Sequence, residues 1–155
     1  MLDALVAHDV DFVVIGGLAG VLRGSSYPTY DLDIAYGRTD DNLERLAAAL
    51  RELGARLRGA PEDIPFILDA KALKSGAHFT FVTPYGSIDI LTDPDGAPAY
   101  EELKRGSGGR HPLEGILVHA ASLDHLIGMK EAAGRAKDKL MAGEYRTLAD
   151  EISKE

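Results

Sequence analysis

Three aspartates of this chain lie where their side chains could hold divalent metal ions. Asp31 and Asp33 alternate with Leu32 and Ile34, and Asp89 stands between two isoleucines. Alternation with a period of two is typical of a β-strand, so the paired acids share one face, with Cα atoms roughly 6 to 7 Å apart. Three converging carboxylates can hold two ions that activate an attacking hydroxyl and neutralise a leaving pyrophosphate. The pattern predicts metal-assisted phosphoryl transfer.

A pair of glycines precedes these acids. Gly16 and Gly17 separate an apolar, β-branched run at 12–15 from a segment with helical spacing at 18–22. Glycines at a strand-to-helix turn let backbone amides approach an anion, and a helix start adds unpaired donors. We therefore expect both glycines to hold a triphosphate. A dinucleotide-binding fingerprint fits less well, because its glycine spacing differs and its acid comes about twenty residues later.

Spacing alone does not identify the metal site. The same pattern occurs at Asp9 and Asp11, in a helix-to-strand turn, and at Asp93 and Asp95, on either side of a proline. Both contexts are typical of turns. The position of Asp31 and Asp33 on a strand, after the glycine pair, distinguishes them from the other two pairs.

The elements that must position these residues follow from hydrophobic periodicity and turn signals. Apolar positions with helical spacing and capping residues predict helices at 2–8, 18–22, 40–53 and 122–134, a helical turn at 100–103 and a helical last twenty residues. Strands are predicted at 12–15, 31–36, 79–82, 88–91 and 115–120, with 79–91 forming a hairpin. Prolines interrupt residues 55–75, which we interpret as a short strand and a surface connection.

This order of elements predicts an α/β (α+β) fold. A mixed β-sheet would carry the aspartates on one face, and flanking helices would cover the other. The length of 155 residues suits a single domain, 1–155. Within it, 1–97 would form the catalytic core and 98–155 a C-terminal strand and helices.

Composition narrows the function. The chain has no cysteine, which excludes disulfides and thiolate zinc sites and fits the cytoplasm. We expect no membrane association. A net charge of -8 argues against general nucleic-acid binding, so any such contact must be local. We interpret the basic cluster Arg51, Arg56 and Arg58 as favourable charge at a helix C-terminus rather than as an RNA contact.

The segments VVIGGLAGVLRG, TYDLDIAY and GSIDIL resemble the nucleotidyltransferase superfamily, whose fold is like that of DNA polymerase beta, and particularly its small bacterial members. The resemblance implies transfer of a nucleoside monophosphate from an NTP to an acceptor hydroxyl, with release of pyrophosphate and with Mg²⁺ or Mn²⁺ bound. It places nucleotide binding at Gly16, Gly17 and Thr29 and metal binding at the three aspartates. Tyr27 stands where many relatives carry an arginine.

The segment HLIGMKEAAGRAKD resembles the C-terminal helix of the AbiEii-like toxin branch. That resemblance implies that Lys130 and Arg135 contact nucleotide phosphates or the acceptor, and that the partner is a cognate antitoxin or a second copy of the chain. The base of the NTP stays open, and the acceptor could be RNA, protein or a small molecule such as an antibiotic.

Two other functions use the same residues. One is a catalytically idle module that binds a nucleotide or a partner, and the other is a metal-dependent phosphoesterase. His78, which begins the strand expected beside that of Asp89, is a further candidate for the site, whereas the other four histidines are scattered without metal-site spacing.

Overall fold

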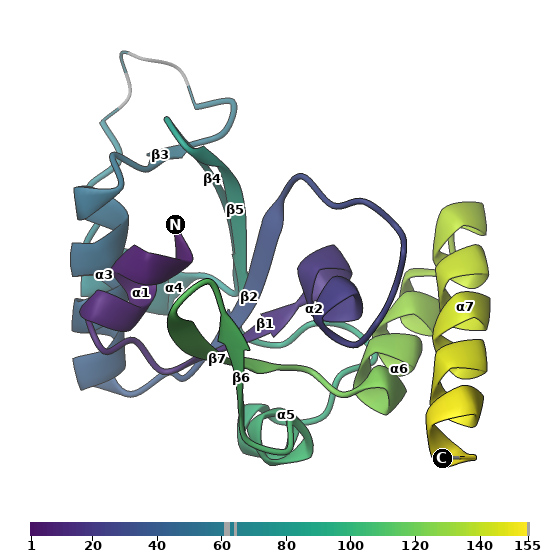
Figure 1. Ribbon diagram of the computed structural model, residues 1–155. Helices are drawn as coiled ribbons and strands as arrows, with labels where there is room; N and C mark the ends of the chain where they lie inside the picture. The colour runs from purple at the N-terminus through teal and green to yellow at the C-terminus, as the bar shows by residue number, and fades with distance from the viewer. Residues whose placement is uncertain (61–62, 64, 155) are drawn as a thin grey trace.

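A mixed sheet runs through the centre of the protein, with helices on both sides (Figure 1). The computed structural model describes residues 1–60, 63 and 65–154. Within that part of the chain, seven strands lie in the order β3-β4-β5-β2-β1-β7-β6. Their bounds are β1 Phe12–Ile15, β2 Leu32–Tyr36, β3 Arg56–Leu57, β4 His78–Thr83, β5 Gly86–Leu91, β6 Arg110–Leu113 and β7 Ile116–Ala120.

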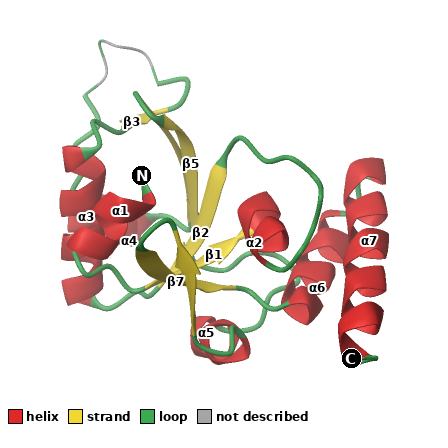
Figure 2. Cartoon of the chain, viewed as in Figure 1, coloured by secondary structure: helices red, strands yellow, loops and turns green. Residues whose placement is uncertain are grey.

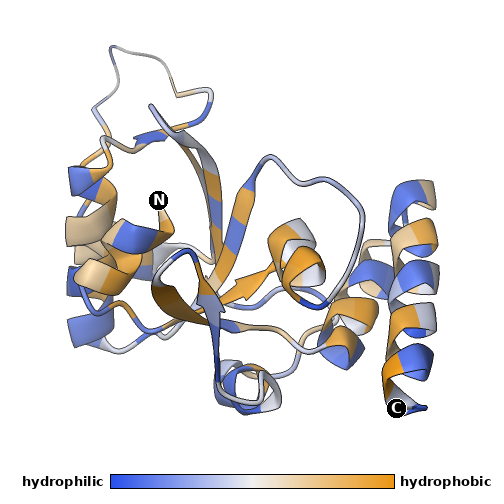
Figure 3. Ribbon diagram, in the orientation of Figure 1, coloured by the Kyte–Doolittle hydropathy of each residue, from blue (hydrophilic) through white to orange (hydrophobic). Residues whose placement is uncertain are grey.

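The centre of the sheet is its most hydrophobic part. All four residues of β1 are buried, which fits a strand covered on both faces. β1 pairs antiparallel with β2 and parallel with β7, and β2 pairs parallel with β5. Figure 3 shows β1 as hydrophobic throughout, whereas β2 and β5 alternate. The predicted mixed sheet is therefore confirmed.

Helices cover both faces of the sheet, not one face as predicted. Figure 2 shows α1 (Leu2–Ala7), α3 (Asp40–Glu52) and α4 (Ala70–Ser75) on one side, and α2 (Gly16–Leu22), α6 (Leu123–Ala133) and α7 (Ala136–Ser153) on the other. The register of β1 with β2 explains the second layer. Val13 and Ile15 share the face of Asp33, and both are buried, so that face also needs a covering helix near β1.

The best-defined helix ends follow the predicted signals. Thr39 caps α3, its Oγ1 accepting a hydrogen bond from the Asn42 amide at 3.2 Å. Ser122 caps α6 in the same way, and Gly134 ends α6 in the left-handed conformation with φ at 70°. The predicted helices at 40–53 and 122–134 are thus confirmed.

Three elements differ from the sequence prediction. The short strand within 55–75 is present as β3, but the surface connection also contains α4, whose first turn is capped by the Asp69 carboxylate. The helical turn at 100–103 extends into α5 (Tyr100–Gly106). β6 was missed because Pro112 marks an edge strand, where its missing N–H costs no ladder bond. Pro61, one of the two prolines in 55–75, lies outside the described residues.

Among the described residues, no helix has both the length and the apolar character that crossing a membrane requires.

Candidate functional site

Asp33 and Asp89 lie side by side on one face of the sheet. The parallel register of β2 and β5 pairs Asp33 with Asp89, and the adjacent Ile34 and Ile90 point to the opposite, buried face. Burial, followed by a hydrogen bond and charge repulsion from Asp89, raises the pKa of Asp33 to about 7. The fold therefore brings these two predicted carboxylates together.

Asp31 lies apart from this pair. It is exposed and precedes β2, which begins at Leu32 and not at Asp31 as predicted. The Thr29 hydroxyl donates to the Asp31 carbonyl oxygen at 3.2 Å and holds the turn into the strand. The charge of Asp31 still reaches the pair, since it contributes to the raised pKa of Asp33.

The two glycines form the first residues of α2, directly against the site. Gly16 has φ at 66°, a left-handed conformation that favours glycine, and a Cβ at this position would collide with the Asp33 carboxylate. A Cβ on Gly17 would approach Thr29 Oγ1 to 2.7 Å. The sequence suggested that these glycines make room for phosphates. In the structure the glycines have an additional role, because their lack of a side chain allows Asp33 and Thr29 to lie close to the start of α2.

Two residues of β4 surround Asp89. Thr80 is its cross-strand neighbour, and the Thr80 hydroxyl donates a hydrogen bond to Asp89 Oδ1. His78 Nε2 lies 3.7 Å from the same oxygen, and the His78 side chain is half exposed. His78 is therefore beside the site, as suggested, while Thr80 was missed. The hairpin register would have revealed it, because residues opposite each other on paired strands share a face.

Lys130 and Arg135 converge on Asp138 at the junction of α6 and α7. Lys130 Nζ lies 3.4 Å from Asp138 Oδ1, and Arg135 Nε lies 2.7 Å from Oδ2. Asp138 is buried, and the hydrogen bond from Arg135 is the main reason why its pKa lies below the usual value. Lys130 also acts on the aspartate site. Its positive charge lowers the pKa of Asp33, whereas burial and the neighbouring aspartates raise it. The sequence did not indicate that Asp138 holds both cations.

The donor atoms suit a hard divalent cation such as Mg²⁺, which prefers carboxylate oxygens. Asp33 and Asp89 are the two groups that would hold it. Their side chains lie next to each other on paired strands, and the two carboxylates repel each other when no cation or proton lies between them. Among the residues that the structure describes, no three His, Cys, Asp or Glu side chains are grouped for metal binding. Asp31 would have to turn toward the pair to complete the predicted set of three carboxylates.

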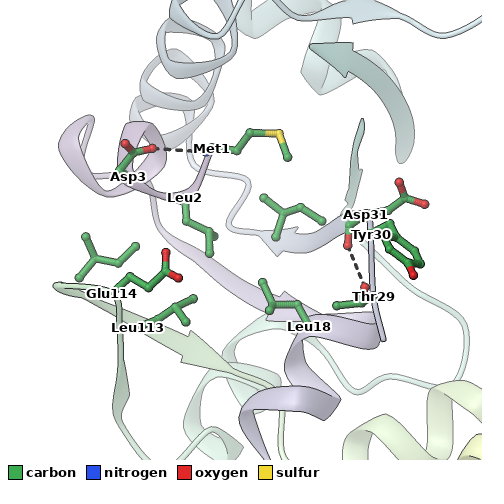
Figure 4. A pocket seen from close by; sticks show the side chains of 11 residues that line it. Met1, Leu2, Asp3, Leu18, Thr29, Tyr30, Asp31, Leu113 and Glu114 are labelled. Carbon is green, nitrogen blue, oxygen red and sulfur yellow. Dashed lines mark hydrogen bonds and ion pairs between the residues drawn. The ribbon is translucent and has the colours of Figure 1, made fainter. Parts of the chain in front are cut away.

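A pocket of about 410 Å³ borders Asp31 and the start of α2. Figure 4 shows Leu2, Leu18 and Leu113 around its interior, with Thr29 and Asp31 at one wall and the Asp31 carboxylate directed away from the interior. Leu18, which lines the pocket, follows Gly17 directly in the chain. Its size falls within the range of about 300 to 1,000 Å³ common for small-molecule sites.

No protein-family model matches the chain, and no curated protein matches it significantly. Several solved structures do match the chain. The chain is similar to a candidate nucleotidyltransferase from Thermotoga maritima (TM-score 0.56, 16% identity, covering 99% of this chain and 88% of that one). It is also similar to ANT(2″)-Ia in complex with adenylyl-2″-tobramycin (0.52, 16%, 94% and 92%). A third similar structure is the lincosamide antibiotic adenylyltransferase LnuA bound to lincomycin (0.62, 14%, 95% and 92%). The fold of this chain is therefore that of nucleotidyltransferases.

Proposed function

We propose that this protein is a metal-dependent nucleotidyltransferase that moves a nucleoside monophosphate from an NTP to an acceptor hydroxyl. The observation that carries the proposal is the pairing of Asp33 with Asp89 beside Gly16, at the start of α2. Support also comes from the fold, which is shared with structures described as nucleotidyl- or adenylyltransferases. The proposal includes Mg²⁺ or Mn²⁺ at Asp33 and Asp89, with Asp31 as the third ligand.

The transfer is an in-line displacement at the α-phosphorus. The acceptor oxygen forms a new bond to this phosphorus, the bond to the bridging oxygen breaks, and pyrophosphate leaves with the electron pair. The hydroxyl proton passes to the Asp89 carboxylate or to water. The bound cation supplies positive charge that neutralises the phosphate oxygens. Gly16 and Gly17 would face the triphosphate with backbone amides, and Thr29 would hold the turn that presents Asp31.

The pocket next to Asp31 is proposed to take the nucleoside. Its lining by Leu2, Leu18 and Leu113 suits the face of a base, and Leu18 follows Gly17, where the triphosphate is proposed to begin. Lys130 is the cation whose charge reaches Asp33, so it is the side chain proposed to balance the phosphates. Arg135, which is largely exposed, would assist it from the start of α7.

The test measures NTP binding and pyrophosphate release with labelled NTPs, with and without Mg²⁺, in the presence of fractionated cell extract as the source of acceptor. Asp33→Asn and Asp89→Asn should each lower release about 100-fold or more, because each removes a carboxylate proposed to hold the cation that neutralises the phosphates. Asp93→Asn is the matched control, since Asp93 is an exposed turn residue with the same side chain.

Unchanged release by Asp33→Asn would sink the proposal. NTP binding with no release from any fraction would favour the idle binding module, and phosphate release without an acceptor would favour a phosphoesterase. Likeness to the AbiEii-like toxin branch, and with it a cognate antitoxin, remains a prediction from the sequence.

A further inference from the structure

A second cavity lies at the other end of β1 from the aspartates. It has a volume of about 230 Å³ and is formed where the α1–β1 turn, α3, α5 and the β6–β7 hairpin meet. Asp11 directly precedes β1, whereas Ile15, which pairs with Asp33, ends it. A strand rises about 3.3 Å per residue, so these two places lie about 13 Å apart along β1. In Figure 1, α5 lies below the sheet, away from the loop that enters β2 from above. The cavity is therefore separate from the aspartate site.

Three cationic side chains from three different elements line this cavity. Arg45 belongs to α3, Lys104 to α5 and Arg110 to β6. The acids that line it are Asp9 and Asp11, so three cations stand against two carboxylates. The whole chain, by contrast, has a net charge of -8. The cavity thus concentrates positive charge in an acidic protein.

One of the two acids is already engaged with the protein. Lys104 Nζ lies 2.9 Å from Asp11 Oδ1, and the Tyr100 hydroxyl donates to the same oxygen at 2.8 Å. The other acid, Asp9, is exposed in the turn before β1, with φ at 57°. Lys104 and Asp11 therefore neutralise each other, and the excess charge comes from the two arginines.

The two arginines have no comparable partner. Among the described residues, neither Arg45 nor Arg110 forms an ion pair. In the same part of the chain, Arg45 Nε is buried without a hydrogen-bond partner. Buried polar groups in native proteins are almost always hydrogen-bonded, because an unpaired one costs free energy. A guanidinium group presents paired donors that match the geometry of a phosphate. A phosphate in the cavity would supply the missing acceptor.

His119 completes the polar lining. It pairs with Arg110 across the β6–β7 hairpin, and its Nδ1 lies 2.8 Å from Ser107 Oγ. The Ser107 hydroxyl donates to backbone carbonyl oxygens, that of Lys104 at 2.6 Å, so it accepts a hydrogen bond from Nδ1. His119 can therefore offer Nε2 to a ligand. Burial, followed by the charges of Lys104 and Arg110, lowers the pKa of His119, and the same charges would attract an anion.

We propose that this cavity binds a compact phosphate, held by the guanidinium groups of Arg45 and Arg110 and by Nε2 of His119. The cavity is smaller than the range of about 300 to 1,000 Å³ common for small-molecule sites, so the ligand is inorganic phosphate or a small phosphate ester. The bound phosphate would link α3 to the β6–β7 hairpin. The inference does not depend on the proposed transfer reaction, because its three residues lie outside the aspartate site.

The test measures the binding of inorganic phosphate by isothermal titration calorimetry, without NTP or divalent cation and with the ionic strength kept constant by chloride. Arg110→Gln should raise the Kd about tenfold, because it removes a charge-assisted hydrogen bond. Arg105→Gln is the matched control, since Arg105 is an exposed residue of α5 outside the cavity lining. Because Arg110 is also exposed, Arg110→Gln should keep the parent Tm without phosphate, which separates lost binding from unfolding.

A second titration, with glycerol phosphate, distinguishes the two sources of the ligand. Stronger binding of the ester than of inorganic phosphate would make the ligand the phosphate group of a small metabolite. Binding of inorganic phosphate that is at least as strong would make free phosphate the ligand.

The ring protons of two histidines locate the bound phosphate by NMR. Phosphate should shift the resonances of His119, in the cavity, and leave those of His78, beside Asp89, unchanged. A shift at His78 alone would place the anion at the aspartate site and overturn the proposal. The absence of saturable phosphate binding, or equal weakening by Arg105→Gln and Arg110→Gln, would overturn it as well.

Discussion

Two carboxylates that face each other repel strongly unless a proton or a cation lies between them. Asp33 and Asp89 are in this position because the β2–β5 register pairs them on the same face. Glycine at position 16 allows the contact with α2, since any larger residue would collide with the Asp33 carboxylate. The fold therefore holds two carboxylates close enough to repel each other, and a bound cation would reduce this repulsion.

Burial of Asp33, together with the hydrogen bond and repulsion from Asp89, predicts an unusual pH dependence of stability. The pKa of Asp33 is raised from 3.8 to about 7, so the folded protein binds a proton that the unfolded chain releases. The contribution of Asp33 to the free energy of unfolding is fully present below about pH 4 and is lost as the pH rises through about 7. We expect the parent Tm to fall more than that of Asp33→Asn between about pH 5 and pH 8, and Mg²⁺ to restore it at the higher pH. Parallel curves for the two proteins would contradict the assignment.

Thr80 allows a second test at the scale of single residues. Its hydroxyl donates to Asp89, and a hydrogen bond to a charged group contributes about 1.5 to 3 kcal/mol. Thr80→Val should lower kcat/KM of the transfer about tenfold, whereas Thr80→Ser, which keeps the hydroxyl, should stay close to the parent. Similar losses in both variants would indicate that packing, not the hydrogen bond, matters at this position.

At the scale of elements, the segment between α2 and β2 is fastened at two points. Near its start, Arg23 Nη2 donates to the carbonyl oxygens of Ala120 and Ser107 at 2.7 and 2.8 Å. Further along, Glu144 of α7 accepts from the Ser25 hydroxyl at 3.1 Å and the Ser26 amide at 3.2 Å. The same segment carries Thr29 and Asp31, so α7 helps to fix the entrance to the site.

We therefore expect Glu144→Ala to loosen this segment without unfolding the protein. The KM for NTP should rise about fivefold with a small change in kcat, because a mobile segment must be ordered at the moment of binding. Limited proteolysis should cleave the variant faster within residues 25–31. Glu151→Ala, an exposed substitution on the same helix, is the control, and equal cleavage of the two variants would count against the role of Glu144.

Strong hydrophobic periodicity made most of the helices and strands predictable from the sequence. The features that were not predicted depend on how the strands pair in the folded protein. The strands that hold Asp33 and Asp89 follow from alternation, and so does the expectation that the two acids meet. Asp31 was placed on the strand because alternation does not reveal where pairing ends. β6 and the position of Thr80 depend on which strands become neighbours, and local sequence does not contain that information.

At the scale of the whole molecule, Asp138 joins the two C-terminal helices to each other. It is buried at the start of α7 and binds Lys130 of α6 as well as Arg135. α7 also reaches the N-terminal half, because Tyr145 packs against Gly20 of α2, where a Cβ would collide with the tyrosine hydroxyl. The C-terminal helices are thus part of the same packed structure as the sheet.

Loss of the Asp138 carboxylate should weaken this junction. Asp138→Ala is expected to lower the Tm by about 4 °C or more at neutral pH, while Asp150→Ala, on an exposed turn of α7, should change it little. Because the pKa of Asp138 is lowered, its contribution is present above about pH 4 and disappears as acid protonates it. The two variants should therefore converge in Tm at low pH, and a constant difference would contradict this explanation.

The parallel pairing of β1 with β7 has a consequence for synthesis of the chain. Val13 pairs with His119 across the sheet, so the two strands come from distant parts of the sequence. While the ribosome is still producing the residues between them, one edge of the apolar β1 has no partner. Exposed strand edges of this kind promote aggregation, so the nascent protein passes through a vulnerable interval that ends when β7 emerges.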